Sequence, residues 1–118
     1  MYKAKEEQRI QLRENVRDGT GLIFVRHLLE KAETLGITTM CLVMTINPGV
    51  SIGPHSHESG VDAEIYYIIQ GEVASGDPGH EVLMKAGDVS FTGNGHVHFL
   101  ENRSEQAAEV FAIIIRQK

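Results

Sequence analysis

The feature that most constrains the fold is a series of short apolar segments separated by turns that contain glycine. From residue 64 onward the segments span 64–70, 72–75, 81–85, 89–92, 98–102 and 109–116. Three of the turns are Gly76-Asp77-Pro78-Gly79, Ala86-Gly87-Asp88 and Gly93-Asn94-Gly95. Glycine supplies the positive φ that tight hairpins require. Short strands at regular spacing are typical of a sandwich or barrel, so we expect an all-β protein.

Two longer apolar segments precede this series. Residues 22–29 are bounded by glycine, and residues 38–46 are almost continuously apolar, which predicts a strand covered on both faces. Residues 30–36 between them are expected to form a loop or a single helical turn. The segments 22–29 and 110–115 are too apolar for exposed sheet edges, so either this domain or a second subunit should cover them. We therefore expect a homodimer in which sheets extend across subunits.

The N-terminal arm, residues 1–20, is rich in charge. Residues 6–16 fit neither the helical nor the strand period, so a helical turn and an extended arm both remain open. The stretch Met1-Tyr2-Lys3-Ala4-Lys5-Glu6-Glu7 lacks the apolar core of a signal peptide, and no apolar run approaches the roughly 20 residues of a membrane span. These features predict a cytoplasmic protein that does not act on membranes.

The chain length limits the number of domains. With 118 residues, the chain fits one domain over residues 1–118, with the barrel core at about 38–116. A net charge of −5 argues against a nucleic-acid surface and leaves small molecules as the expected partners. Cys41 is the single cysteine and lies in an apolar segment, so we interpret it as a core thiol.

Four of the six histidines form two His-x-His pairs, at 55/57 and at 96/98. Residues two apart in a strand point to the same side, so each pair could direct both imidazoles at one point. The same alternation places Glu64 and Tyr66 on one face. Three imidazoles and one carboxylate suit Mn, Fe, Co, Ni or Zn better than Ca or Mg. Four protein ligands would leave two octahedral positions open for a substrate.

These residues carry a family resemblance. Residues 49–57, followed by Glu64 and Gly71, resemble the first motif of the cupins, and residues 87–102, with His98 and Asn102, resemble the second. The resemblance covers about residues 38–116 and implies a double-stranded β-helix, the jelly-roll barrel of that family. It also implies a mononuclear metal site on His55, His57, Glu64 and His98.

The chain departs from the motifs at two places. Six residues, 58–63, separate His57 from Glu64 where the family usually has three or four. Glu58 or Asp62 could therefore replace Glu64 as the ligand, although the spacing to Gly71 favours Glu64. Gly93 stands where the second motif usually has proline, which removes stiffness from the turn before His98.

The chain looks most like the single-domain, oxalate-decarboxylase-like cupins. That resemblance implies a metal site that binds a small carboxylate or similar metabolite, with decarboxylase or dioxygenase chemistry as a possibility. The candidate acids and bases are Glu58, Asp62, Tyr66 and His96. A binding or regulatory module without turnover is the alternative. A sugar phosphate isomerase is a third hypothesis, which the absence of a clustered basic patch near the motifs disfavours.

The remaining notable side chains have plainer interpretations. His96 is expected to lie beside the site or in solvent, because the motif selects His98. His27 and His80 are interpreted as structural or surface residues. Met40, Met44 and Met84 are expected to fill gaps in the core. Arg26 should be exposed, paired, or placed to receive an anionic substrate, since an unpaired buried guanidinium is costly.

Overall fold

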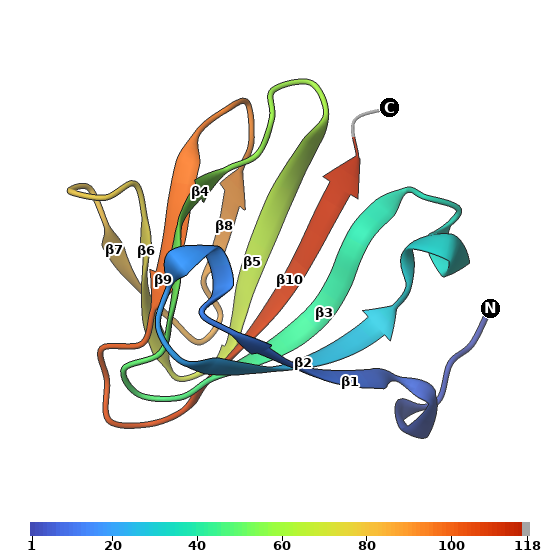
Figure 1. The fold of residues 1–118 in the computed structure, drawn as a ribbon, viewed down its shortest axis with the longest axis horizontal. Helices are drawn as coiled ribbons and strands as arrows, with labels where there is room; N and C mark the ends of the chain where they lie inside the picture. The colour runs from blue at the N-terminus through green and yellow to red at the C-terminus, as the bar shows by residue number, and fades with distance from the viewer. Residues whose placement is uncertain (117–118) are drawn as a thin grey trace.

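The computed structural model describes residues 1–116 and consists of two facing antiparallel sheets (Figure 1). The six-stranded sheet has the order β1 (Arg9–Glu14), β2 (Leu22–Leu29), β3 (Thr38–Ile46), β10 (Ala108–Arg116), β5 (Asp62–Gln70), β8 (Val89–Thr92). The four-stranded sheet has the order β4 (Ser51–Ser56), β9 (Val97–Glu101), β6 (Glu72–Gly76), β7 (Val82–Lys85). Three short 3₁₀ helices are η1 (Lys5–Glu7), η2 (Val16–Asp18) and η3 (Lys31–Thr34). The all-β prediction is confirmed.

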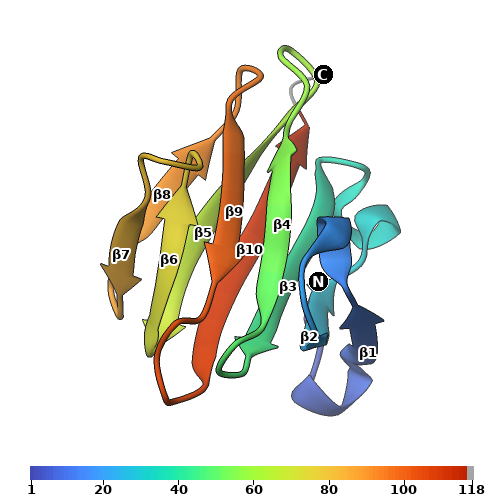
Figure 2. The same ribbon diagram turned by 60° about the vertical axis from the view of Figure 1, so that its left-hand side comes forward.

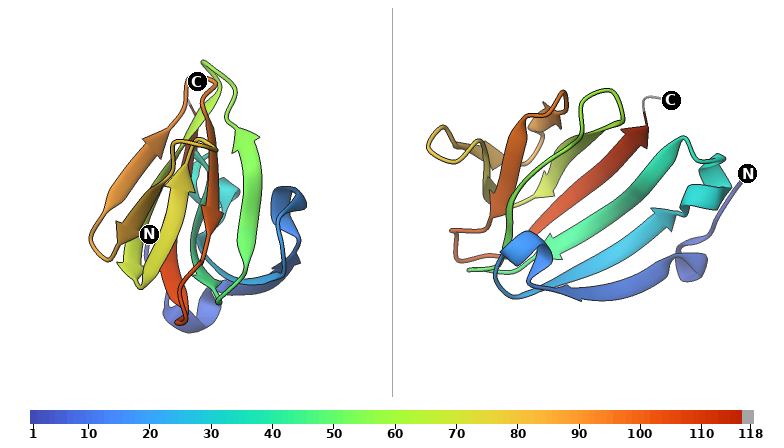
Figure 3. Two further views of the ribbon diagram at one scale, coloured as in Figure 1. Left: turned by 90° about the vertical axis from the view of Figure 1, so that its left-hand side faces the viewer. Right: turned by 45° about the horizontal axis from the view of Figure 1, so that its top comes forward.

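Side chains that alternate along the strands fill the space between the sheets. Glu64, Tyr66 and Ile68 are buried, whereas the intervening Tyr67 and Ile69 are each 43% exposed, as the alternation predicts. The other strands of both sheets supply further core residues, among them Ile23, Val25, Leu42, Met44, Ile46, Val73, Leu100 and Val110. Strands β1 and β2 extend the larger sheet past β4 (Figures 2 and 3). One side of the barrel is therefore lined by the N-terminal arm.

The predicted strands agree with the structure to within one or two residues at their ends. Residues 6–16, for which the sequence allowed either a helical turn or an extended arm, are mostly extended, since β1 pairs with β2. Residues 30–36 contain the single turn η3, as expected. Strand β4 was not among the predicted segments, because Gly53 and Pro54 interrupt its apolar pattern.

The expectation that residues 22–29 and 110–115 do not lie at exposed sheet edges is confirmed. Strand β10 lies between β3 and β5, and β2 lies between β1 and β3, so this chain itself covers both segments. The edge argument for a homodimer therefore fails, and the homodimer stays a prediction.

Asn102, the asparagine of the second motif, ties three chain segments together. It is fully buried, and its Nδ2 donates to the carbonyl oxygens of Ile46 and Gln106, each at 2.8 Å. Its Oδ1 accepts from the backbone N–H of Ser104 at 2.9 Å. Because one side chain satisfies the end of β3 and the loop before β10, Asn102 fixes the closed end of the barrel.

The other predicted structural residues lie as follows. Cys41 is buried, and burial raises the pKa of its thiol, in agreement with a core thiol. His27 is buried and its Nε2 lies 2.8 Å from Gln11 Oε1, whereas His80 is exposed in the turn before β7. Arg26 is half-exposed on the outer face of β2. Among residues 1–116, no helix has the length and apolar character needed to cross a membrane.

Candidate metal centre

Both sheets contribute side chains to one point near the mouth of the barrel. His55 in β4 stands directly opposite His98 in β9, and His57 follows the last residue of β4. Glu64 comes from β5 in the facing sheet, where Ile114 and Thr92 are its neighbours in the ladder. The structure thus brings together the three histidines and the glutamate that the motifs predicted. Their ligand atoms all lie within 4.8 Å of one another.

The distances between these atoms fit the shell of a single ion. Glu64 Oε1 lies 3.0 Å from His57 Nε2, 3.1 Å from His98 Nε2 and 3.8 Å from His55 Nε2. His98 Nε2 lies 3.1 Å from His57 Nε2 and 3.0 Å from His55 Nε2. Two ligand atoms about 2.1 Å from a metal and at right angles to each other are about 3.0 Å apart. The four side chains need little movement to hold a metal ion.

The opposite side of each ring decides which nitrogen carries the proton. His55 Nδ1 lies 2.8 Å from the carbonyl oxygen of Gly53, which can only accept, so Nδ1 donates. His57 Nδ1 lies 3.5 Å from Asp62 Oδ1, which favours the same tautomer. His98 Nδ1 is buried and has no hydrogen-bond partner within residues 1–116. In neutral His55 and His57, the Nε2 lone pairs therefore point at the shared centre, an arrangement that suits a cation.

The pKa of each group in the cluster depends on its neighbours in the cluster and on burial. Burial alone would raise the pKa of the Glu64 carboxyl, but hydrogen bonds from His55, His57 and His98 hold that pKa well below its ordinary value. The hydrogen bond to Glu64 raises the pKa of His57. Burial lowers the pKa of His98. One carboxylate that stays ionised and three imidazoles form a donor set that Mn, Fe, Co, Ni and Zn accept.

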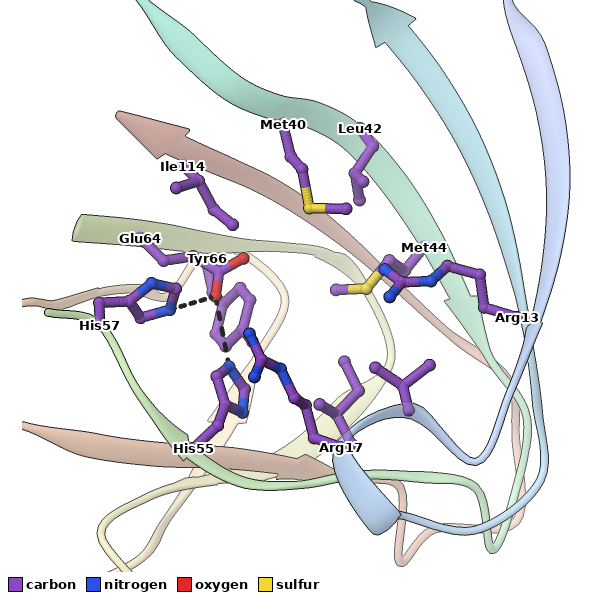
Figure 4. A pocket seen from close by; sticks show the side chains of 12 residues that line it. Arg13, Arg17, Met40, Leu42, Met44, His55, His57, Glu64, Tyr66 and Ile114 are labelled. Carbon is purple, nitrogen blue, oxygen red and sulfur yellow. Dashed lines mark hydrogen bonds and ion pairs between the residues drawn. The ribbon is translucent and has the colours of Figure 1, made fainter. Parts of the chain in front are cut away.

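A cavity of about 140 Å³ opens onto this cluster (Figure 4). Its wall is mostly apolar, formed by Val16, Met40, Leu42, Met44, Ile52 and Ile114. The Tyr66 ring forms part of the lining and stacks on His98, with centroids 4.8 Å apart and an interplanar angle of 11°. This stacking fixes the orientation of the His98 imidazole. Burial raises the pKa of the Tyr66 hydroxyl well above its ordinary value, so the hydroxyl keeps its proton at neutral pH.

The four candidate acids and bases lie in different places. Tyr66 lines the cavity, and Asp62 stands behind His57. Glu58 is exposed and is not part of the cluster, which keeps Glu64 as the candidate ligand. His96 is exposed in the turn before β9 and borders an outer depression with Phe91, so the two histidines of the second pair do not point together.

The longer loop and the missing proline both have a structural counterpart. Strand β5 begins at Asp62, two residues before Glu64, so the extra residues let Asp62 reach the back of His57. A Cβ atom on Gly93 would lie 2.8 Å from the Ala63 side chain, closer than van der Waals contact permits. Glycine therefore allows the turn before His98 to pack against β5.

Sequence reasoning missed two residues of the cavity, Arg13 and Arg17. Arg13 lies in β1, and Arg17 lies in η2 with the left-handed backbone angles φ 53° and ψ 41°. Such a conformation is uncommon for a residue with a side chain and is maintained here by the surrounding contacts. The isolated sequence carries no signal for this placement, because it depends on contacts between the arm and β4.

The comparisons with known proteins agree with this geometry. The family model described as the cupin domain matches residues 42–114. The chain is 41% identical over 101 residues to an oxalate-binding protein of Thermotoga maritima, covering 86% of this chain and 82% of the relative. A crystal structure of a predicted oxalate decarboxylase from the same organism has 37% identity and a TM-score of 0.89, covering 98% of this chain and 99% of the other.

A more distant structure shares the fold alone. The polyketide cyclase of Streptomyces resistomycificus is 18% identical, with a TM-score of 0.73 over all of this chain and 80% of the other. The fold alone therefore does not indicate a particular activity. On the match of the cupin domain and the identity to its relatives, this chain belongs to the cupin family.

Proposed function

We propose that the chain binds one divalent transition-metal ion on His55, His57, Glu64 and His98 and holds a small carboxylate at that site. The observation that carries the proposal is the convergence of three Nε2 atoms and Glu64 Oε1 within 4.8 Å at the end of a cavity. The bound ion would supply a positive centre with open positions for carboxylate oxygens. The donor set fits Mn, Fe, Co, Ni and Zn alike, so it does not select one of them.

The size and lining of the cavity support a ligand of oxalate's dimensions. A volume of about 140 Å³ corresponds to a handful of water molecules, which is sufficient for a ligand as small as oxalate. One relative, 41% identical, is named an oxalate-binding protein. A sugar phosphate is several times larger than oxalate, so the cavity gives no support to the isomerase hypothesis.

Binding without turnover is the form of this function that the site supports best. Of the four candidate acids and bases, only Tyr66 lines the cavity, and its raised pKa makes it a hydrogen-bond donor rather than a base. Decarboxylation is the second candidate, favoured by the similarity to a predicted oxalate decarboxylase. It would require a proton donor at the carbon that loses carbon dioxide.

One experiment separates these possibilities. The purified chain is loaded with the ion that elemental analysis finds in it, titrated with oxalate by calorimetry, and then assayed for formate. Saturable binding that depends on the metal, without formate, supports the proposal. Formate production supports the decarboxylase. Absence of oxalate binding by the loaded chain contradicts both.

We also propose that residues 1–118 form one cytoplasmic domain that pairs as a homodimer. An apolar outer face on the six-stranded sheet supports the dimer. It includes Phe24, Tyr67, Ile69, Val89 and Phe91, which are between 41% and 66% exposed. Tyr67 and Val89 stand directly opposite each other in the ladder between β5 and β8, and adjoining exposed apolar side chains are typical of an interaction surface.

A further inference from the structure

The N-terminal arm closes one side of the metal cavity through tight contacts with β4. A Cβ atom on Gly53 would lie 2.0 Å from the carbonyl oxygen of Arg17, and a Cβ on Gly19 would lie 2.2 Å from that of Ser51. Only glycine permits this approach. The backbone N–H of Ser51 donates to the carbonyl oxygen of Thr20 at 2.9 Å, and Thr20 N–H donates to Ser51 Oγ at 3.0 Å. The arm is therefore held in one position on the barrel.

This position directs two guanidinium groups into the cavity. The side chains of Arg13 and Arg17 both point inward, with Arg17 on the side of His55 (Figure 4). Neither forms an ion pair with any residue from 1 to 116, whereas Arg9 on the same arm is paired with Glu30 at 3.0 Å. Arg17 is exposed at the rim of the cavity, and it shares its left-handed backbone with Asn15 and Asp18 of the same turn.

Outside the metal cluster, the lining of the cavity formed by residues 1–116 offers these arginines no anionic side chain. Apart from the metal cluster and Tyr66, the other lining residues are apolar. A divalent ion and the Glu64 carboxylate would leave one net positive charge, and the two guanidinium groups add two more. A ligand with two anionic ends would satisfy both the metal side and the arginine side. Guanidinium is suited to a carboxylate because it offers parallel N–H donors.

We infer that Arg17, assisted by Arg13, selects a small dicarboxylate over a monocarboxylate by contacting the carboxylate end that the metal cluster does not hold. This inference rests on the proposed function, since it assigns a substrate class to the same site. Arg13 and Arg17 are specificity residues here, and they take no part in holding the metal.

The test compares two probes, oxalate and acetate, on metal-loaded variants by calorimetry. Arg17→Gln should lower oxalate affinity about 10- to 100-fold, the loss expected for a charge-assisted hydrogen bond, and should change acetate affinity less than about 3-fold. Metal content should stay unchanged. Arg17→Lys, which keeps the charge, should restore part of the oxalate affinity. Arg26→Gln is the matched control, because it removes the same charge from the outer face of β2 and should affect neither probe.

The outcomes distinguish failure of the inference from failure of the proposed function. Equal losses for oxalate and acetate, or an unchanged oxalate affinity in Arg17→Gln, would overturn the inference while the metal site stands. Absence of oxalate binding by the wild-type loaded chain would overturn the proposed function and the inference together. If Arg17→Gln does not fold, Arg13→Gln in β1 provides the test instead. A smaller loss of affinity for oxalate but not for acetate would support the inference, and no such selective loss would refute it.

Discussion

The Asp62 carboxylate lies 3.5 Å from His57 Nδ1, on the side of the ring opposite Glu64. A carboxylate there keeps a proton on Nδ1 and leaves the Nε2 lone pair free for a metal ion. The substitution Asp62→Asn preserves size, removes the charge, and allows an amide N–H to face Nδ1, which stabilises the opposite tautomer. We therefore expect Asp62→Asn to weaken metal binding without removing a ligand.

The structure sets the size of this effect. Loss of such a supporting carboxylate generally costs 10- to 100-fold in metal affinity, or about 1.4 to 2.8 kcal/mol. The Asp62 side chain is 26% exposed, and 3.5 Å is longer than a well-formed hydrogen bond. Solvent screening and the long contact both weaken the interaction, so we expect a loss of about tenfold, at the lower end of that range.

A competition titration against a chromophoric chelator at fixed pH measures this loss. Glu58→Gln is the matched control, because it removes the same charge from the same loop at an exposed position and should leave metal affinity unchanged. Equal affinities in the two variants would refute the reasoning about His57. Complete loss of metal in Asp62→Asn, with metal retained in Glu64→Gln, would show that Asp62 is the ligand.

Three further predictions follow from the fold and the site. Asn102→Ala leaves the buried Ile46 carbonyl unpaired and should lower stability by about 2 to 4 kcal/mol, seen as a fall of about 1 to 2 M in the urea midpoint. The control Asn47→Ala at the exposed turn should change stability by less than about 0.5 kcal/mol. Metal occupancy should fall as pH drops through about 6.5, and His57 should take up a proton before His98, because the hydrogen bond to Glu64 raises the pKa of His57 and burial lowers that of His98. Indifference to pH between 8 and 5 would contradict histidine ligation. Light scattering should give about twice the 13.0 kDa chain mass, and a monomer at micromolar concentration would refute the dimer.

The sequence predicted those parts of the site that depend on local pattern. Alternation along one strand correctly placed Glu64 and Tyr66 on the buried face. The alternation did not apply to the second histidine pair, because His96 lies in the turn before β9 and only His98 lies inside that strand. One residue beyond a strand end the alternation is no longer reliable, since it held for His57 after β4 and failed for His96 before β9.

The parts that could not be predicted depend on contacts between distant segments. The position of β10 inside the sheet follows from its pairing with β3 and β5, which the apolar run at 110–115 does not reveal. The placement of Arg17 depends on the approach of η2 to Gly53, across more than thirty residues of sequence. The sequence of a charged arm does not show against which surface the arm packs.

We propose that one metal ion is held by His55, His57, Glu64 and His98. The most direct measurement is elemental analysis of the purified chain beside its His57→Ala and His98→Ala variants, with circular dichroism to verify that each remains β-rich. We expect about one divalent transition-metal ion per wild-type chain and none in either folded variant. Equal metal content in all three proteins would contradict it.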